Sequence, residues 1–165
     1  MERIIKGKAL KYGDNINTDI ISPPQYMELS IADAAVHAMR AVDPDFHVKA
    51  KDHSIFVAGA NLGSGSSRET APLTLKYLGT EVVIARFFAR IFYRNCINLG
   101  IPAIECPEAD KISEGDALVI DLELGAIENI SKNECYRCGK IPAHIFELIE
   151  AGGLIGYLHN SVGGR

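Results

Sequence analysis

Between residues 54 and 105 the sequence alternates short apolar runs with helix-length segments, and this alternation constrains the fold more than any other feature. Glycines 79 and 100 stand where the two helical segments should end. The predicted order is strand 54–58, helix 68–78, strand 81–85, helix 87–99 and strand 102–105. Such an order predicts parallel strands with helices packed on the sheet. Ligands bind beyond the carboxyl ends of such strands, which for the first strand is residues 59–69.

The flanking segments add to this parallel core. Residues 117–122 and 126–130 predict an antiparallel pair, and residues 142–151 predict a last helix that stops at a Gly-Gly pair. An alanine-rich helix is expected at 31–42, whereas residues 13–24 are rich in turn formers and predict a loop that carries polar groups. No repeat or long linker divides the chain. We therefore expect one α/β domain over residues 1–165.

Charge and hydropathy exclude several classes of protein. The chain has 17 basic and 21 acidic residues, a net charge of −4 and no basic block, so nucleic acid is not an expected partner. No signal-peptide pattern or membrane-length apolar run occurs, which predicts a cytoplasmic protein without a membrane partner. The four cysteines are expected to be free thiols, with Cys96 in the core. Cys135 and Cys138 form a single C-x-x-C, which suits either a metal or redox role or ordinary surface thiols.

Residues 59–69 read Gly-Ala-Asn-Leu-Gly-Ser-Gly-Ser-Ser-Arg-Glu and are suited to hold an anion. Glycines allow the backbone to approach a ligand closely, and a following helix start offers unpaired N–H groups. Arg68 adds a planar cation that matches a carboxylate or phosphate. Ser66 and Glu69 also have the spacing of a capping box. A plain helix cap is therefore the alternative to a ligand site.

Arg86, Arg90 and Arg94 are spaced by four residues and should form one stripe on helix 87–99. Three stacked cations repel one another unless negative groups face them. The stripe is either a solvated face paired with acidic side chains or a brace for a substrate site or partner subunit. Spacing alone does not separate these two interpretations.

Three motifs in a fixed order resemble the small subunit of 3-isopropylmalate dehydratase, which is a separately encoded form of the mobile C-terminal domain of aconitases. They occupy residues 13–21, 63–69 and 89–95, and the similarity extends from Gly7 to about Leu158. The resemblance implies a swivelling β/β/α domain that lies over a large subunit. In that family three cysteines of the large subunit hold a [4Fe–4S] cluster. No cofactor or metal would then be bound by this chain.

The resemblance also assigns roles to single residues. It implies that Ser66 is the alkoxide base that removes a proton beside a substrate carboxylate, and that Arg68 holds that carboxylate. Thr18 and Asp19 match a Thr-Asp pair near the base, where the aspartate orients groups or relays a proton. Gly65 and Ser67 would help to bind the substrate. Thr70 departs from the histidine that many relatives carry after the Arg-Glu pair.

The variable part of the substrate would be read at residues 26–29, where Met27 and Leu29 could line an apolar pocket. Glu28 stands where relatives that bind a third carboxylate carry arginine, so tricarboxylates are disfavoured. The implied reaction is the isomerisation of 2-isopropylmalate to 3-isopropylmalate, a hydro-lyase reaction of leucine biosynthesis. The alternatives are the small subunit of 2,3-dimethylmalate dehydratase or homoaconitase, a citrate-specific relative, and a non-catalytic anion-binding module.

Overall fold

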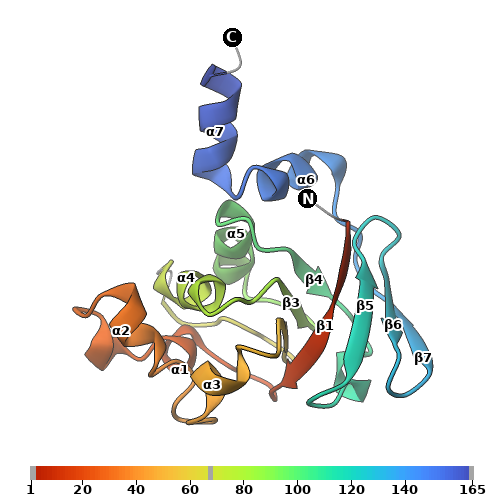
Figure 1. Cartoon of the computed structure of the whole chain (residues 1–165), viewed down its shortest axis with the longest axis horizontal. Coiled ribbons are helices and arrows are strands. Elements are labelled where there is room, and N and C mark those ends of the chain that lie inside the picture. Colours follow the sequence, from red (N-terminus) through yellow and green to blue (C-terminus); the bar gives the residue numbers. More distant parts are fainter. Residues whose placement is uncertain (1–2, 67–68, 164–165) are drawn as a thin grey trace.

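A computed structural model describes residues 3–66 and 69–163. In this part of the chain one seven-stranded sheet runs through the molecule in the order β4-β3-β2-β1-β5-β6-β7. Its strands are β1 (Ile4–Lys11), β2 (Ile55–Val57), β3 (Val82–Ala85), β4 (Ala103–Glu105), β5 (Ala117–Asp121), β6 (Ala126–Asn129) and β7 (Glu134–Arg137). The sheet is curled, and β5 to β7 lie at the right of Figure 1. The predicted α/β class is confirmed.

The parallel half consists of β1 to β4. Strand β2 pairs with β3 and β3 with β4, both in parallel register, as the alternation of residues 54–105 predicts. Every residue of β2 and β3 is buried, which explains why these strands read as continuous apolar runs. Strand β1 adds to the same half by pairing in parallel with β2. The pattern of residues 4–11 did not predict this strand.

The antiparallel half begins at the same strand β1, which pairs with β5 along its other edge. Strands β5 and β6 form the predicted antiparallel pair, and the residues of β5 alternate between buried and half-buried positions. Strand β7 extends this half beyond the prediction and contains Cys135. The C-x-x-C segment therefore lies on an edge strand and the residue after it, and not in a turn.

Two helices connect the parallel strands. Helix α4 (Thr70–Tyr77) and helix α5 (Arg90–Asn98) fall within the predicted segments but begin two and three residues later than expected. Helix α5 contacts both α4 and β4. Its buried side chains are Phe92, Cys96 and Ile97, so the predicted core position of Cys96 is confirmed.

The segment between β1 and β2 differs most from the prediction. The turn-rich residues 13–24 contain helix α1 (Thr18–Ile21) and lead into the 3-10 helix η1 (Pro24–Tyr26). Asn17 caps α1 by accepting a hydrogen bond from Ile20 N–H at 2.8 Å. The alanine-rich segment is helical only over α2 (Ile31–Ala35), and helix α3 (Phe46–Lys49) follows. The longer helix is interrupted because Met39 has φ +59°, while its N–H donates to carbonyls of α1.

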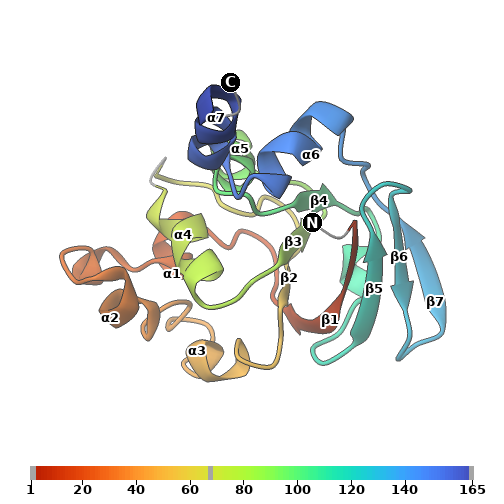
Figure 2. The ribbon, with the colours of Figure 1, turned by 45° about the horizontal axis from the view of Figure 1, so that its top comes forward.

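Two helices end the described chain. Helix α6 (Ala143–Glu150) matches the predicted last helix, and α7 (Leu154–Gly163) follows it without having been predicted. Helix α7 lies at the top of Figure 1, and in the turned view of Figure 2 it remains on the side away from α3. Among residues 3–66 and 69–163, no helix has the length and apolar character that crossing a bilayer requires.

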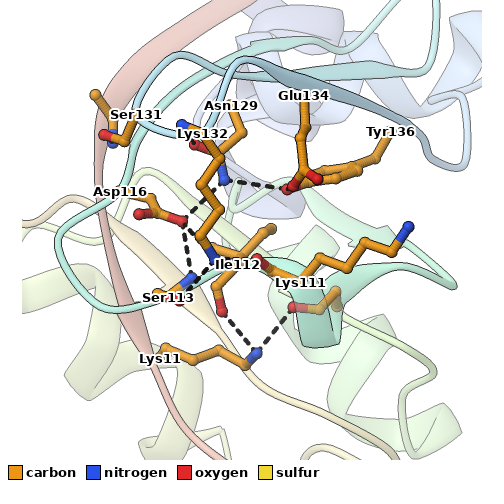
Figure 3. Close-up of polar contacts among 12 residues, drawn as sticks. Lys11, Lys111, Ile112, Ser113, Asp116, Asn129, Ser131, Lys132, Glu134 and Tyr136 are labelled. Atoms are coloured by element: carbon orange, nitrogen blue, oxygen red, sulfur yellow. Dashed lines mark hydrogen bonds and ion pairs between the residues drawn. The ribbon is translucent and has the colours of Figure 1, made fainter.

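A polar cluster closes the lower end of the antiparallel half (Figure 3). Lys11 Nζ donates to the carbonyls of Ala109 and Ile112 at 2.9 and 2.8 Å. Asp116 accepts from Asn129 Nδ2 at 2.8 Å and from Ser113 N–H at 2.9 Å. These bonds satisfy polar groups that the sheet would otherwise bury without partners, so the cluster has a structural role.

Candidate active site

Two loops that are far apart in the sequence run side by side at the carboxyl end of β2. Gly63 N–H donates to Ile16 O at 2.7 Å, and Thr18 N–H donates to Ser64 O at 2.9 Å. Ser66 N–H donates to the side-chain oxygen Oγ1 of Thr18 at 3.0 Å. The first and second motifs of the sequence thus form one hydrogen-bonded unit.

Short polar side chains hold the beginning of this unit together. Asn15 and Asn61 both have left-handed backbone conformations, with φ values of 57° and 59°. The side-chain amide of Asn61 donates to Asn15 Oδ1 at 3.2 Å, and Asp14 Oδ1 accepts from Ala60 N–H at 2.7 Å. Asparagine tolerates this backbone region better than most residues do. The Asp-Asn-rich composition of residues 13–17 is therefore explained by the geometry of the loop.

On its other side the glycine loop lies against the segment that precedes α5. Leu62 N–H donates to Phe87 O at 3.2 Å, and Ala89 N–H donates to Leu62 O at 2.9 Å. Gly63 has φ +88°, and a Cβ atom there would overlap the ring of Phe92. Only glycine fits this position, because both the backbone conformation and the space exclude a side chain. The segment that contains the third motif, residues 89–95, therefore contacts the glycine loop on one side, and the first motif, residues 13–21, contacts it on the other.

Ser66 is exposed at the end of this clamped loop. Helix α4 begins at Thr70, with Glu69 at its N-cap and no side-chain cap bond. The predicted capping box, which needs Ser66 at the N-cap, is therefore wrong. Ser67 and Arg68 lie outside the described residues. Gly65, which directly precedes the serine, has φ +106°, and Thr18 accepts the N–H of Ser66.

Asp19 is exposed in the first turn of α1 and borders a pocket of about 380 Å³. Asn17, Pro23, Tyr26 and Arg40 also line this pocket. Thr18 contacts the glycine loop, whereas its neighbour Asp19 faces the pocket. The pocket therefore starts one residue from the contact that holds Ser66.

The segment predicted to read the substrate begins beside this pocket. The ring of Tyr26 stacks on His37 with 3.7 Å between centroids, and Arg40 Nη1 lies 2.7 Å from His37 Nδ1. Met27, Glu28 and Leu29 follow on the surface, and the side chains of Met27 and Leu29 are about half exposed. They do not line the pocket beside Asp19. Sequence reasoning missed Arg40, and no motif identifies it.

The predicted stripe of three arginines on one helix is wrong for Arg86, which is not part of α5. Arg86 precedes α5 and forms an ion pair with Asp110 at 3.5 Å between Nη1 and Oδ2. Arg90 and Arg94 are on α5 and exposed, and no hydrogen bond or ion pair joins them to the described part of the chain. The stripe thus consists of two arginines whose charge is not paired within residues 3–66 and 69–163.

A larger cavity and the cysteines lie elsewhere. A hollow of about 580 Å³ borders Ile4, Thr80 and Pro102, at the amino ends of the parallel strands, which is the wrong end for ligand binding in this type of sheet. Within the residues described, no group of three or more His, Cys, Asp or Glu could hold a metal ion. Cys96 and Cys106 are buried, and Cys135 is exposed.

The arrangement suits proton transfer to or from an anionic substrate that a second molecule covers. A serine stands exposed at the end of a loop whose backbone is hydrogen-bonded to two neighbouring segments, and a carboxylate lies on one of these segments. Rigid positioning of the reacting group is a large part of catalysis. The chain offers the serine on an open face and not in an enclosed cavity, so another surface must exclude water from it.

Comparison with known proteins gives consistent matches. Residues 2–109 match the model of the aconitase C-terminal domain. The 3-isopropylmalate dehydratase small subunit of Halothermothrix orenii is 51% identical over 153 residues, which cover 92% of this chain and 93% of that protein. The isopropylmalate/citramalate isomerase small subunit of Methanocaldococcus jannaschii is 48% identical, covering 96% and 95%. The crystal structure of 3-isopropylmalate dehydratase from that organism superposes with a TM-score of 0.91 at 42% identity, covering 96% and 95%.

Proposed function

This chain belongs to the family of 3-isopropylmalate dehydratase small subunits, and from that premise we propose that it isomerises 2-isopropylmalate and 3-isopropylmalate together with a large subunit. The reaction is a dehydration followed by rehydration, in leucine biosynthesis. The observation that carries the proposal is that Ser66 is exposed at the end of the glycine loop, where its N–H donates a hydrogen bond to Thr18 Oγ1 at 3.0 Å. We also infer that residues 1–165 act as one swivelling domain, because β1 belongs to both halves of the sheet.

Ser66 removes the proton from the carbon beside a substrate carboxylate. That carbon is a very weak acid, so the base must be an alkoxide and the developing negative charge needs support. The amino end of the α4 dipole and the guanidinium of Arg68 favour negative charge near the serine. Arg68 binds the carboxylate of the substrate in a bidentate manner, and Ser67 and Gly65 complete the binding loop.

Asp19 works beside the base. It lies next to Thr18, whose hydroxyl oxygen fixes the backbone of Ser66, and it borders the pocket that opens beside the loop. From this position Asp19 orients the groups that accept or return the proton. A [4Fe–4S] cluster held by the large subunit would supply the Lewis acid for the departing hydroxyl group. In this proposal the present chain removes the proton of the substrate.

The substituent of the malate is read at the pocket beside Asp19 and at Met27, Glu28 and Leu29. The carboxylate of Glu28 disfavours substrates with a third carboxylate. A second candidate substrate is a malate with a smaller substituent, such as citramalate or 2,3-dimethylmalate. It is supported by the 48% identity to a subunit named for both isopropylmalate and citramalate.

The test is to combine the chain with a cognate large subunit under anoxic conditions and to follow the unsaturated intermediate by its absorbance. The unsubstituted complex should turn over 2-isopropylmalate, and Ser66→Ala should lose at least about a thousandfold in kcat while still binding the large subunit. Full activity of the Ser66→Ala complex would exclude the serine as base. A panel of citramalate, dimethylmalate and homoaconitate measures the substrate preference.

A further inference from the structure

One face of α5 and the turn before it is exposed and carries both apolar and cationic side chains. It consists of Phe87, Arg90, Ile91 and Arg94, which we call the docking face. Their spacing of three and four residues places Arg90, Ile91 and Arg94 on one side of the helix. The side chains of Phe87 and Ile91 are each 49% exposed. The opposite side of α5 is buried, so the exposure is not a property of the whole helix.

Helix α5 and the turn before it contact the loop that carries Ser66. Phe87 accepts a hydrogen bond from Leu62 N–H through its carbonyl at 3.2 Å. Phe92, the neighbour of Ile91, packs against Gly63. The segment from which the docking face begins is therefore fixed to the loop that, four residues after Leu62, presents Ser66.

The charges of the docking face have no counterpart on this chain. Arg90 and Arg94 lie four residues apart on one helix and repel each other. Arg86 is paired with Asp110 at 3.5 Å, whereas neither of the two helix arginines has an ion pair within the described residues. The chain as a whole carries a net charge of −4, so these cations do not belong to a general basic excess. Carboxylates from another molecule would remove the repulsion.

A hollow beside the docking face provides room for side chains of that molecule. Arg90 and Arg94 border it on one side, and Ile145 and Leu148 of α6 border it on the other, around a volume of about 370 Å³. Apolar walls with cations at the rim match an interface that has an apolar centre and charged edges. The hollow is thus shaped for an apolar side chain flanked by acidic ones.

We propose that the docking face binds the large subunit, through apolar side chains flanked by carboxylates of that subunit. The inference rests on the proposed function, because that function requires a second chain over Ser66. It goes further by locating the contact on α5 and by assigning Arg90 and Arg94 to association and not to the reaction. Mutation of such rim charges changes the association rate and its salt dependence more than it changes chemistry.

The test separates binding from turnover. The Kd for the large subunit is measured by titration under anoxic conditions for the unsubstituted chain, for Arg94→Glu and for the double variant Arg90→Glu/Arg94→Glu. We expect Kd to rise about tenfold in the single variant and about a hundredfold in the double variant. At saturating large subunit, kcat should stay within about twofold of the unsubstituted value. Lys51→Glu, in the exposed turn after α3, is the matched control and should leave Kd unchanged.

The other outcomes overturn the proposal in different ways. An unchanged Kd in the double variant, or a loss of kcat at saturation without a change in Kd, removes α5 from the interface. Loss of self-association in the double variant, with an unchanged Kd for the large subunit, assigns the face to a second copy of this chain. Failure of the unsubstituted chain to bind any large subunit contradicts the proposed function itself, whereas a fully active Ser66→Ala complex with intact Kd contradicts only the base.

Discussion

The N–H of Ser66 donates a hydrogen bond to Thr18 Oγ1 at 3.0 Å, and this bond joins residues that are 48 positions apart in the sequence. Thr18 in turn donates its own N–H to Ser64 O at 2.9 Å. The threonine is therefore both donor and acceptor to the glycine loop, and it is 2% exposed. The place of the candidate base depends on α1 as much as on the loop that contains it.

Replacing Thr18 by valine should lower activity more than stability. Valine has a similar volume but no acceptor, so the N–H of Ser66 loses its partner, at a cost of about 1–3 kcal/mol. We expect kcat/KM of the reconstituted enzyme to fall roughly tenfold to a hundredfold. Thr18→Ser, which keeps the hydroxyl oxygen, should retain most of the activity. Full activity of Thr18→Val together with a loss in Thr18→Ser would show that the methyl group of Thr18 matters and the hydrogen bond does not.

Gly63→Ala should destabilise the chain far more than Gly115→Ala. The two glycines have nearly the same backbone conformation, with φ values of +88° and +86°. A Cβ atom at residue 63 would overlap the Phe92 ring, whereas none of the described atoms lies within 4 Å of a Cβ at residue 115. Both variants carry backbone strain of about 1–2 kcal/mol, and Gly63→Ala adds about 1–3 kcal/mol of overpacking. Urea unfolding of the two variants measures the difference, and similar midpoints would contradict the assigned contact.

Acid should destabilise the fold partly through Asp116. Burial favours its protonated form, but hydrogen bonds from Ser113 N–H and Asn129 and the charge of Lys132 outweigh burial and place the pKa of Asp116 below its ordinary value. A depressed pKa in the folded state stabilises the fold above the pKa of the unfolded chain, near 3.9. This contribution is lost as the pH falls through the lower, folded pKa.

Asp116→Asn should therefore lower the free energy of unfolding at pH 7 by about 1.5–3 kcal/mol, the usual contribution of hydrogen bonds to a charged group. The difference from the unsubstituted chain should shrink as the pH is lowered from 5 towards 2. Asp52→Asn is the control, because Asp52 is exposed in a turn and no ion pair joins it to the described residues. A difference that stays constant with pH would show that Asp116 acts through packing.

Thiol modification should distinguish Cys135 from the other three cysteines. Cys135 is exposed on β7, whereas Cys96 and Cys106 are fully buried. Burial raises the pKa of Cys96 and of Cys106, and it raises the pKa of Cys138 to about 12. A thiol reagent at pH 8 should modify one cysteine rapidly and the others only on unfolding. Cys135→Ser should abolish the fast phase, and a fast phase that persists would mean that Cys138 opens to solvent.

The parallel core could be predicted from the sequence because its signals are local. Strands β2 and β3 are continuous apolar runs, and Gly79 and Gly100 mark the ends of the helical segments with φ values of +99° and +82°. Strand β1 lacks such a signal, since its residues alternate in burial and include a glycine and three lysines. It is a strand because β2 and β5 pair with its two edges, and these partners are distant in the sequence.

The motifs of the candidate site could be predicted from the sequence, but the contacts between these motifs could not. The glycine loop and the Thr-Asp pair are visible as residue types at fixed spacing. The hydrogen bonds between residues 13–18 and 59–66 are not, because they depend on how the sheet brings the two loops together. The contact of Arg40 with Tyr26 and His37 could not be predicted either, because it also depends on the tertiary structure. Met39, next to Arg40, has a left-handed backbone conformation that the alanine-rich sequence does not predict.

The central position of β1 has a consequence for how the chain is synthesised. Strand β1 is translated before both of its partners, the parallel one at residues 55–57 and the antiparallel one at residues 117–121. The edge that pairs with β2 can close once residues 55–57 have been made, but the edge that pairs with β5 stays open until residues 117–121 follow, and open strand edges are sites of aggregation. Co-translational protection of residues 4–11, by a chaperone or by rapid elongation, should therefore govern the yield of this protein more than any change near Ser66.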